Sequence, residues 1–340
     1  MSNESCPVKE QFKTMIGGQA LIEGIMMRGP EKQATVVRNP KEGIVEKVEP
    51  LKKKSGLLTW PLIRGVVNFS GSMISGVKSL MWSAEKSGME DGEEAVEAEP
   101  SKFDQWLEKK LGSEKFMSVV VTISVILGLG FSILLFFLLP MLIGNLFQRL
   151  TNCGVVVQHL IEGLFRIVIF LIYMILVSKL KDMKRVFSYH GAEHKTIRCY
   201  EAKLPLTVEN VRGMTRLHPR CGTSFLFVVM ALSIFLFTIL SAVLNALIPG
   251  LTVLRDQSKI LYNLLMMGAK LVVMLPLVVS VSYEINRFVG RHDNAFTRIL
   301  TAPGMWFQHF TTNEPDDSMI EVAIRALELV LPEQEGADKW

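Results

Sequence analysis

The chain has 340 residues, of which 49% are hydrophobic, 21% are charged and four are cysteines. This composition excludes a disordered, a collagenous and a disulfide-stapled protein. The charges are unevenly distributed, because residues 116–148 and 221–254 contain no Asp, Glu, Lys or Arg. A helix that crosses a bilayer needs about 20 apolar residues. The sequence therefore predicts a multi-pass membrane protein.

Residues 1–56 predict a small β unit at the N-terminus. The β-branched runs 33–38 and 44–49 flank segment 39–43, which contains Asn39, Pro40 and Gly43 and is typical of a hairpin loop. The glycine-rich segment 17–30 offers a third strand. Its glycines fit no nucleotide-binding spacing, so turns or close backbone approaches explain them better.

Residues 57–84 predict one amphipathic helix, and residues 85–101 predict an acidic, disordered linker. The apolar positions at helical spacing are Leu62, Val66, Phe69, Met73, Val77 and Leu80. Arg64 and Lys78 make this helix too polar for an easy crossing. We expect it to be interfacial or packed against the bundle.

Residues 102–285 form the predicted transmembrane region, with four helical spans at about 117–139, 155–178, 224–247 and 260–283. Glu162 and Arg166 fall in the second span and Lys270 in the fourth. A charged side chain at a helix centre costs at least about 2.5–3.5 kcal/mol, so we expect Lys270 to face the bundle and pair with Glu162. The predicted fold is a mainly α membrane protein built on a four-helix transmembrane bundle.

Loop 179–220 carries ten Lys and Arg residues, far more than the other connections between spans. The positive-inside rule therefore places this loop and both termini in the cytoplasm, with the spans in the cell membrane. Residues 286–340 are then a cytosolic segment with an amphipathic helix at 319–328. The lipid bilayer and its anionic head groups are the expected partners. The net charge of +4 needs no nucleic acid to explain it.

The basic loop contains the candidate for chemistry, an H-x-x-E-H pattern formed by His190, Glu193 and His194. On a helix the two histidines lie one turn apart on one face and can reach the same ion. Glu193 is close enough to act as a general base, and zinc lowers the pKa of a water that it binds to about 7. The alternative is a basic helix with two imidazoles facing solvent.

Two histidines need a third ligand, and three residues are candidates. His218 and Cys221 stand at the start of the third span, and together with the histidine pair they would form a closed structural site. Glu284, at the end of the fourth span, would leave one position open, as catalytic sites do. The alternatives are a Glu284 paired with a neighbouring arginine and a Cys221 that is a small buried residue.

Several motifs resemble one family, the bacterial YqhQ-like membrane proteins. These motifs lie at residues 17–20, 23–29, 190–195, 218–224, 302–304 and 311–317, and the resemblance covers residues 15 to 330. It implies a membrane protein and a metal-dependent enzyme of unknown activity. It brings no proven catalytic residue with it.

Two functional hypotheses follow. The first is a zinc-dependent hydrolase, or one using another divalent metal, that acts on a membrane-associated substrate at the cytoplasmic membrane surface. In it His190 and His194 are ligands, Glu193 is the general base, and His218, Cys221 or Glu284 completes the site. The second is a non-enzymatic membrane scaffold, in which a structural zinc ion ties the central loop to the bundle.

Overall fold

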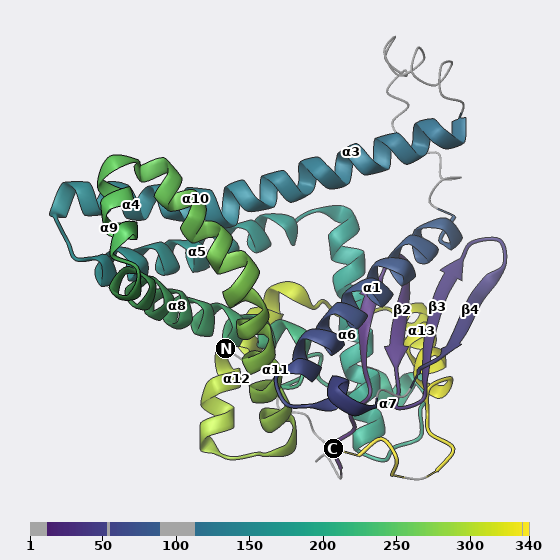
Figure 1. Ribbon diagram of the computed structural model, residues 1–340. Helices are drawn as coiled ribbons and strands as arrows, with labels where there is room; N and C mark the ends of the chain where they lie inside the picture. The colour runs from purple at the N-terminus through teal and green to yellow at the C-terminus, as the bar shows by residue number, and fades with distance from the viewer. Residues whose placement is uncertain (1–11, 53–54, 89–112, 335, 340) are drawn as a thin grey trace. The chain divides into compact units, whose positions relative to one another are not determined.

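The structure is a computed structural model that describes residues 12–52, 55–88, 113–334 and 336–339 (Figure 1). It is mainly helical with a small N-terminal sheet, which confirms the predicted class. The chain divides into two compact units, one formed by Glu90–Tyr173 and the other by Met1–Met89 with Met174–Trp340. Most of the predicted acidic linker, residues 89–101, lies outside the described residues.

The N-terminal sheet has four antiparallel strands in sequential order. The strands are β1 (Gly17–Leu21), β2 (Gly24–Arg28), β3 (Lys32–Asn39) and β4 (Gly43–Pro50). The predicted hairpin between β3 and β4 is confirmed: the Asn39 side chain accepts the N–H groups of Lys41 and Glu42, and Gly43 has a φ of +79°. The glycine-rich segment forms two strands rather than one.

The glycines of this segment allow close approaches between backbones, as expected. A Cβ added to Gly24 would lie 2.4 Å from the Val36 carbonyl oxygen on β3. A Cβ added to Gly29 would lie 2.3 Å from the Val330 carbonyl oxygen, near the other end of the chain. Both contacts are with backbone atoms, so a side chain at either position would force the two segments apart.

Strand β3 is buried on both sides because helices pack against each of its faces. Ala34 and Val36 pack into an apolar core with helices α6 (Lys181–Glu201) and α13 (Asp317–Glu328). Gln33 and Thr35 point to the other face, where they contact Ser79 of helix α1 (Ile63–Lys86). The sheet is thus sandwiched between α1 and the α6–α13 pair (Figure 1).

The rest of this unit is helical. Its further elements are η1 (Gly56–Thr59), α7 (Val208–Arg212), α8 (Gly222–Leu247), α9 (Pro249–Gln257), α10 (Lys259–Ala269), η4 (Lys270–Met274), α11 (Leu275–Arg291) and α12 (Ala295–Thr311). Helix α8 contacts both α11 and α12. The predicted amphipathic helix at 319–328 is confirmed as α13, which begins after Asp316, whose side chain accepts the Met319 N–H at 3.0 Å.

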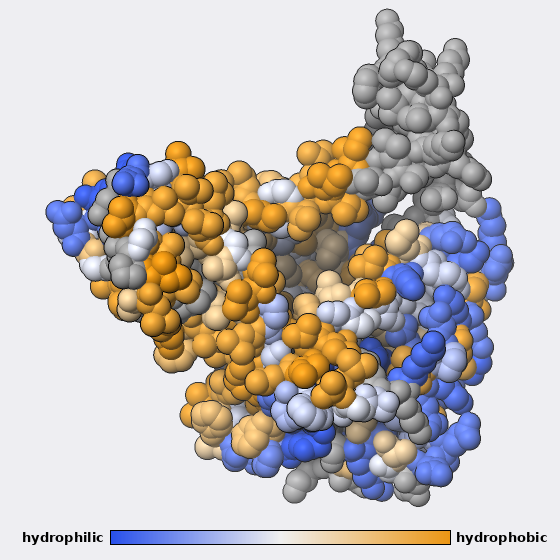
Figure 2. All heavy atoms as spheres, in the orientation of Figure 1, coloured by the Kyte–Doolittle hydropathy of each residue, from blue (hydrophilic) through white to orange (hydrophobic). Residues whose placement is uncertain are grey.

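Within the part of the chain that the structure describes, three stretches of helix are long and apolar enough to cross a membrane: Ile123–Thr151, Val156–Val177 and Ile260–Arg291. In Figure 2 apolar side chains cover the visible surface of α10, at the upper left. Helix α8 occupies the expected third span, but its described apolar stretch, Leu226–Ile239, is shorter than a span. It covers about 21 Å at 1.5 Å per residue. A four-helix transmembrane bundle therefore stays a prediction.

The other unit contains α3 (Ser113–Ile133), η3 (Leu134–Leu138), α4 (Leu139–Thr151) and α5 (Val155–Val177). Pro140 has no N–H to offer the Phe136 carbonyl one turn earlier. Arg166 of α5 donates to that oxygen at 2.9 Å and to Glu162 at 3.0 Å. The carboxylate of Glu162 also contacts His159 at 3.2 Å. The side chain of Lys270, the expected partner of Glu162, is outside the described residues.

We expect Arg166→Met to lower the free energy of unfolding by about 1–3 kcal/mol, because it leaves a buried carbonyl and a buried carboxylate short of a donor. Thermal unfolding in one detergent measures the effect. Glu162→Gln in the same chain removes the uncompensated charge and restores part of the loss. Independent, additive effects of the two substitutions would contradict this account.

Candidate metal and general-base site

Helix α6 places His190 and His194 one turn apart, as their spacing predicts. Their ring centroids lie 4.3 Å apart, and the rings meet edge to face. His194 is 1% exposed, so the alternative of two imidazoles facing solvent does not hold for it. The helix is buried here because it packs against both the sheet and α13.

A backbone carbonyl orients each imidazole. The Nδ1 atom of His190 lies 2.8 Å from the Thr311 carbonyl oxygen, and the Nδ1 atom of His194 lies 2.6 Å from the Arg216 carbonyl oxygen. A carbonyl only accepts hydrogen bonds, so each Nδ1 carries a proton, and Nε2 is the nitrogen that can offer a lone pair to a metal. Histidines that bind metals show this arrangement, in which the second nitrogen donates to a fixed acceptor.

Cys221 completes a group of three possible metal ligands. Its sulfur lies 3.2 Å from the Nε2 atom of His190. The donor atoms of His190, His194 and Cys221 all lie within 4.8 Å of one another. Cys221 directly precedes α8, and the amino-terminal end of a helix favours a thiolate.

Glu193 lies on the same helix, and its carboxylate reaches strand β1. Its Oε1 atom accepts the Gly18 N–H at 2.9 Å. A Cβ added to Gly18 would lie 3.0 Å from the Glu193 Cδ, so glycine permits this contact. The second oxygen, Oε2, is buried and has no hydrogen-bond partner among the described atoms.

Burial sets the protonation states of the site. Burial raises the pKa of Glu193 to about 7, while the nearby His190 opposes this shift. Burial lowers the pKa of His194 to about 4, so its imidazole is neutral at pH 7. The Nε2 atom of His194 is also buried without a hydrogen-bond partner among the described atoms. A carboxyl that titrates near neutral pH therefore lies close to His190 and Cys221, on the same helix as the neutral imidazole of His194.

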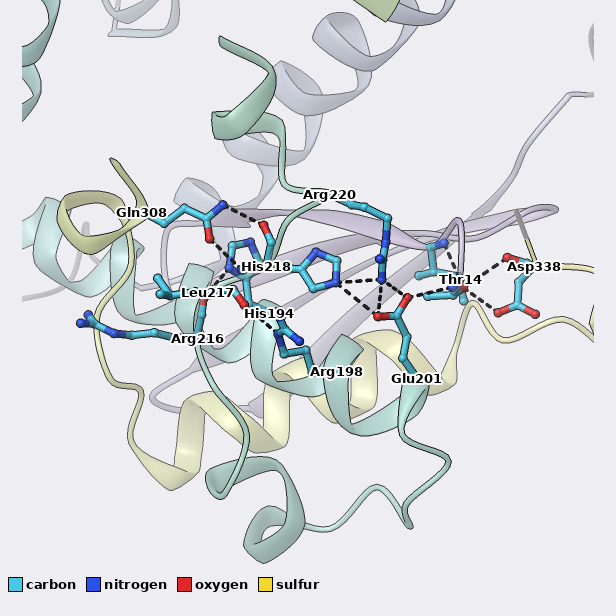
Figure 3. Close-up of polar contacts among 11 residues, drawn as sticks. Thr14, His194, Arg198, Glu201, Arg216, Leu217, His218, Arg220, Gln308 and Asp338 are labelled. Carbon is cyan, nitrogen blue, oxygen red and sulfur yellow. Dashed lines mark hydrogen bonds and ion pairs between the residues drawn. The ribbon is translucent and has the colours of Figure 1, made fainter. Parts of the chain in front are cut away.

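His218, a candidate third ligand, belongs to a different network (Figure 3). Its Nε2 atom lies 3.4 Å from a Glu201 oxygen and 3.3 Å from an Arg220 nitrogen. Arg220 donates to both oxygens of Glu201, and the Thr14 N–H donates to the same carboxylate at 2.8 Å. Burial lowers the pKa of His218 well below its ordinary value, and the Arg220 charge adds to this shift.

Glu284, the third candidate, is not brought to the histidine pair. Its carboxylate accepts two hydrogen bonds from Arg64 of α1, one of them at 2.6 Å. This pairing resembles the alternative stated above, although the arginine comes from another helix rather than from α11. Of the three candidates for a third ligand, the structure brings the ligand atom of Cys221 to the pair. The His218 ring lies 5.5 Å from the His194 ring, but its Nε2 atom contacts Glu201 and Arg220.

Gln308 is a residue of the site region that no pattern in the sequence singles out. It is fully buried on α12, and its amide donates to the His218 carbonyl and accepts the His218 N–H, both at 2.8 Å. The Cys221 N–H in turn lies 3.3 Å from the His218 carbonyl oxygen, which closes the turn 218–221. Gln308 thus fixes the turn that carries the cysteine (Figure 3). Such a contact across the fold leaves no local pattern in the sequence.

The fold and site define a mainly helical protein with helices apolar enough for a membrane and a cluster of two histidines and one cysteine. The chain belongs to the family described as "Protein of unknown function (DUF1385)", whose model matches residues 60–333. It is 30% identical to the "Uncharacterized protein YqhQ" of Bacillus subtilis (strain 168), over 95% of this chain and 94% of that protein. These matches confirm the YqhQ-like family. No solved structure gives a significant match.

Proposed function

We propose that this protein is a metal-dependent enzyme that works at a membrane surface, with hydrolysis as its reaction class. His190, His194 and Cys221 would hold zinc or another divalent metal, and Glu193 would act as the general base. One observation carries this proposal: the three donor atoms lie within 4.8 Å of one another. The second nitrogen of each imidazole is already held by a carbonyl, as in metal sites.

The residues present fit such an ion. Two imidazole nitrogens and one thiolate form a donor set that suits zinc. Donors around a tetrahedral zinc ion lie about 3.3–3.6 Å apart, and the His190 Nε2 and Cys221 Sγ atoms are 3.2 Å apart. A ligand would also give the buried Nε2 atom of His194 a partner. The ion would supply Lewis-acid chemistry at a coordination position that the protein leaves open.

The general base would be Glu193. The Gly18 N–H holds one carboxylate oxygen, which leaves Oε2 to accept a proton from a nucleophile. With a pKa raised to about 7, this carboxyl can both accept and return a proton near neutral pH. Because the site is buried, it keeps out bulk water, and this strengthens the electrostatic interactions of the carboxylate.

The position of the site supports action at the membrane. Cys221 directly precedes α8, the helix at the expected third span, so the site lies at the amino-terminal end of that helix. The ten basic residues of loop 179–220 favour the cytoplasmic side.

The alternative is a structural metal ion that ties α6 to the start of α8. A closed structural site needs a fourth protein donor. His218 is the nearest candidate by sequence, and its Nε2 atom is held by Glu201 and Arg220. This observation favours the catalytic arrangement over the structural one.

We expect about one zinc ion per chain in protein purified without chelators, measured by elemental analysis. His194→Ala and Cys221→Ser should each lose it, because three ligands are the fewest that hold zinc in typical sites. His309→Ala is the matched control, since His309 is exposed on α12 and bonds the Trp306 carbonyl. Wild-type protein that binds no divalent metal would refute both the enzyme and the structural alternative.

Glu193→Gln separates these two functions. The substitution keeps the size of the side chain and removes the base, so the metal content should stay while turnover falls about 10²–10⁴-fold. Turnover is measured on a panel of ester, amide and phosphoester substrates, together with complementation of a deletion strain. Unchanged activity with unchanged metal content would favour the structural alternative.

A further inference from the structure

Helix α1 has an inverted distribution of side chains. The residues that it buries are small or polar: Gly65, Gly76, Ser79 and Ser83. The large apolar residues are 40–63% exposed: Ile63, Phe69, Met73, Ile74, Val77, Leu80 and Met81. Surface helices of soluble proteins do the opposite and bury their apolar face. An exposed apolar stripe of this length marks an interaction surface.

The buried face of α1 is built for close contact with protein. A Cβ added to Gly76 would lie 2.3 Å from the Gln19 side-chain oxygen on β1. Ser75 donates to Gln33 at 2.6 Å, and Ser79 contacts Thr35 at 3.1 Å. Small residues with a few hydrogen bonds are typical of helix contacts in membranes, where burial of apolar surface gives no driving force for association.

Helix α1 also packs on α11, the carboxyl-terminal part of the apolar stretch Ile260–Arg291. A Cβ added to Gly65 would lie 2.7 Å from the Ser280 Cα. Asn68 donates to the Tyr283 hydroxyl at 2.8 Å. The apolar stripe of α1 therefore begins beside a helix that is apolar and long enough to cross a membrane.

Helix α12 shows the same feature beside α8. Phe296, Ile299 and Trp306 are 63%, 74% and 50% exposed. The opposite face packs on α8, where the Phe307 and Phe227 rings lie 5.2 Å apart. Phe227 lies near the amino-terminal end of α8, so this contact places the neighbouring Trp306 near that end of the helix. Figure 2 shows apolar side chains at the start of α1 and over α12.

We propose that the acyl chains of a lipid bilayer cover the exposed faces of α1 and α12, so that both helices lie in the membrane interface. The occupant is lipid rather than a second protein, because each helix rests on an element with the composition of a membrane helix. The charges agree in part: Arg64 pairs with Glu284 and Lys86 with Glu85, whereas the exposed Lys78 suits anionic head groups. This proposal does not depend on a metal or on enzymatic activity.

Each of the two faces carries a tryptophan that can report on lipid. Trp60 immediately precedes α1 and is 58% exposed, and Trp306 lies on α12. Two single-tryptophan chains are made, one that keeps Trp60 and one that keeps Trp306. In each chain the other reporter, together with Trp82, Trp106 and Trp340, is replaced by Phe. Each full-length chain is placed in nanodiscs of phosphatidylcholine with phosphatidylglycerol, with and without bromine on the acyl chains. Bromine quenches tryptophan emission on contact.

We expect brominated discs to reduce the emission of both Trp60 and Trp306. The control is a chain whose single tryptophan is Glu328→Trp on α13, across the sheet from α1, where emission should not change. If the single-tryptophan chains fail to fold, Trp60→Phe and Trp306→Phe in the otherwise unchanged chain answer the same question. Each of these two substitutions should then remove part of the emission that bromine quenches. Emission of Trp60 and Trp306 that bromine leaves unchanged would overturn the proposal and indicate water or a protein partner on these faces.

Discussion

Arg220→Met will lower the free energy of unfolding by about 3–5 kcal/mol, because it leaves the buried carboxylate of Glu201 without its positive partner. Glu201 is 0% exposed, and Arg220 donates to both of its oxygens. The remaining partners are weaker: the Thr14 N–H, a neutral His218 at 3.4 Å and the charge of Arg198. Denaturant unfolding in a single detergent measures the loss.

Two controls isolate this effect. Arg298→Met breaks the exposed pair of Arg298 with Asp293 and should cost no more than about 1 kcal/mol. Glu201→Gln added to Arg220→Met removes the buried charge and should recover part of the stability. A loss below about 1 kcal/mol for Arg220→Met would show that water or another cation replaces the guanidinium.

Gly191→Ala will also destabilise the protein, although alanine is normally the better helix former by about 1 kcal/mol. The added Cβ would lie 2.0 Å from the Asn313 carbonyl oxygen. This atom belongs to backbone, and the Asn313 N–H bonds the Phe187 carbonyl of α6 at 2.9 Å. The segment therefore cannot retreat without breaking that bond, and we expect a loss of about 1–3 kcal/mol.

Gly128→Ala provides the matched comparison for Gly191→Ala. Gly128 is also in the interior of a helix, α3, and nothing lies within 4 Å of its added Cβ. Alanine there should be neutral or stabilising. Thermal unfolding of both variants in one detergent measures the difference, and a Gly191→Ala variant as stable as Gly128→Ala would refute the packing argument.

The sequence alone was sufficient to predict those features that depend on a local pattern of residues. The β3–β4 hairpin follows from Asn39 and Gly43, α13 covers the predicted amphipathic helix, and the apolar runs are helical. The pairing of His190 with His194 follows from helical periodicity alone. Each of these depends on residues within a few positions of one another, so no tertiary contact has to be known.

The third member of the cluster could not be selected from sequence, because it depends on how distant segments meet. The three candidates stand at the ends of predicted spans, and their positions in the sequence allow each of them to contact α6: His218, Cys221 and Glu284. The sequence does not show that Arg64 binds Glu284 or that Arg220 and Glu201 hold His218.

The two imidazoles owe their orientation to the carbonyl groups of Thr311 and Arg216, and every amino acid carries a carbonyl group. The contact to His190 therefore does not depend on which side chain stands at position 311, provided that the residue fits its buried place and α12 still ends there. Comparison of family members by residue identity would overlook this support. Relatives can differ at position 311 and still hold both imidazoles in the same orientation.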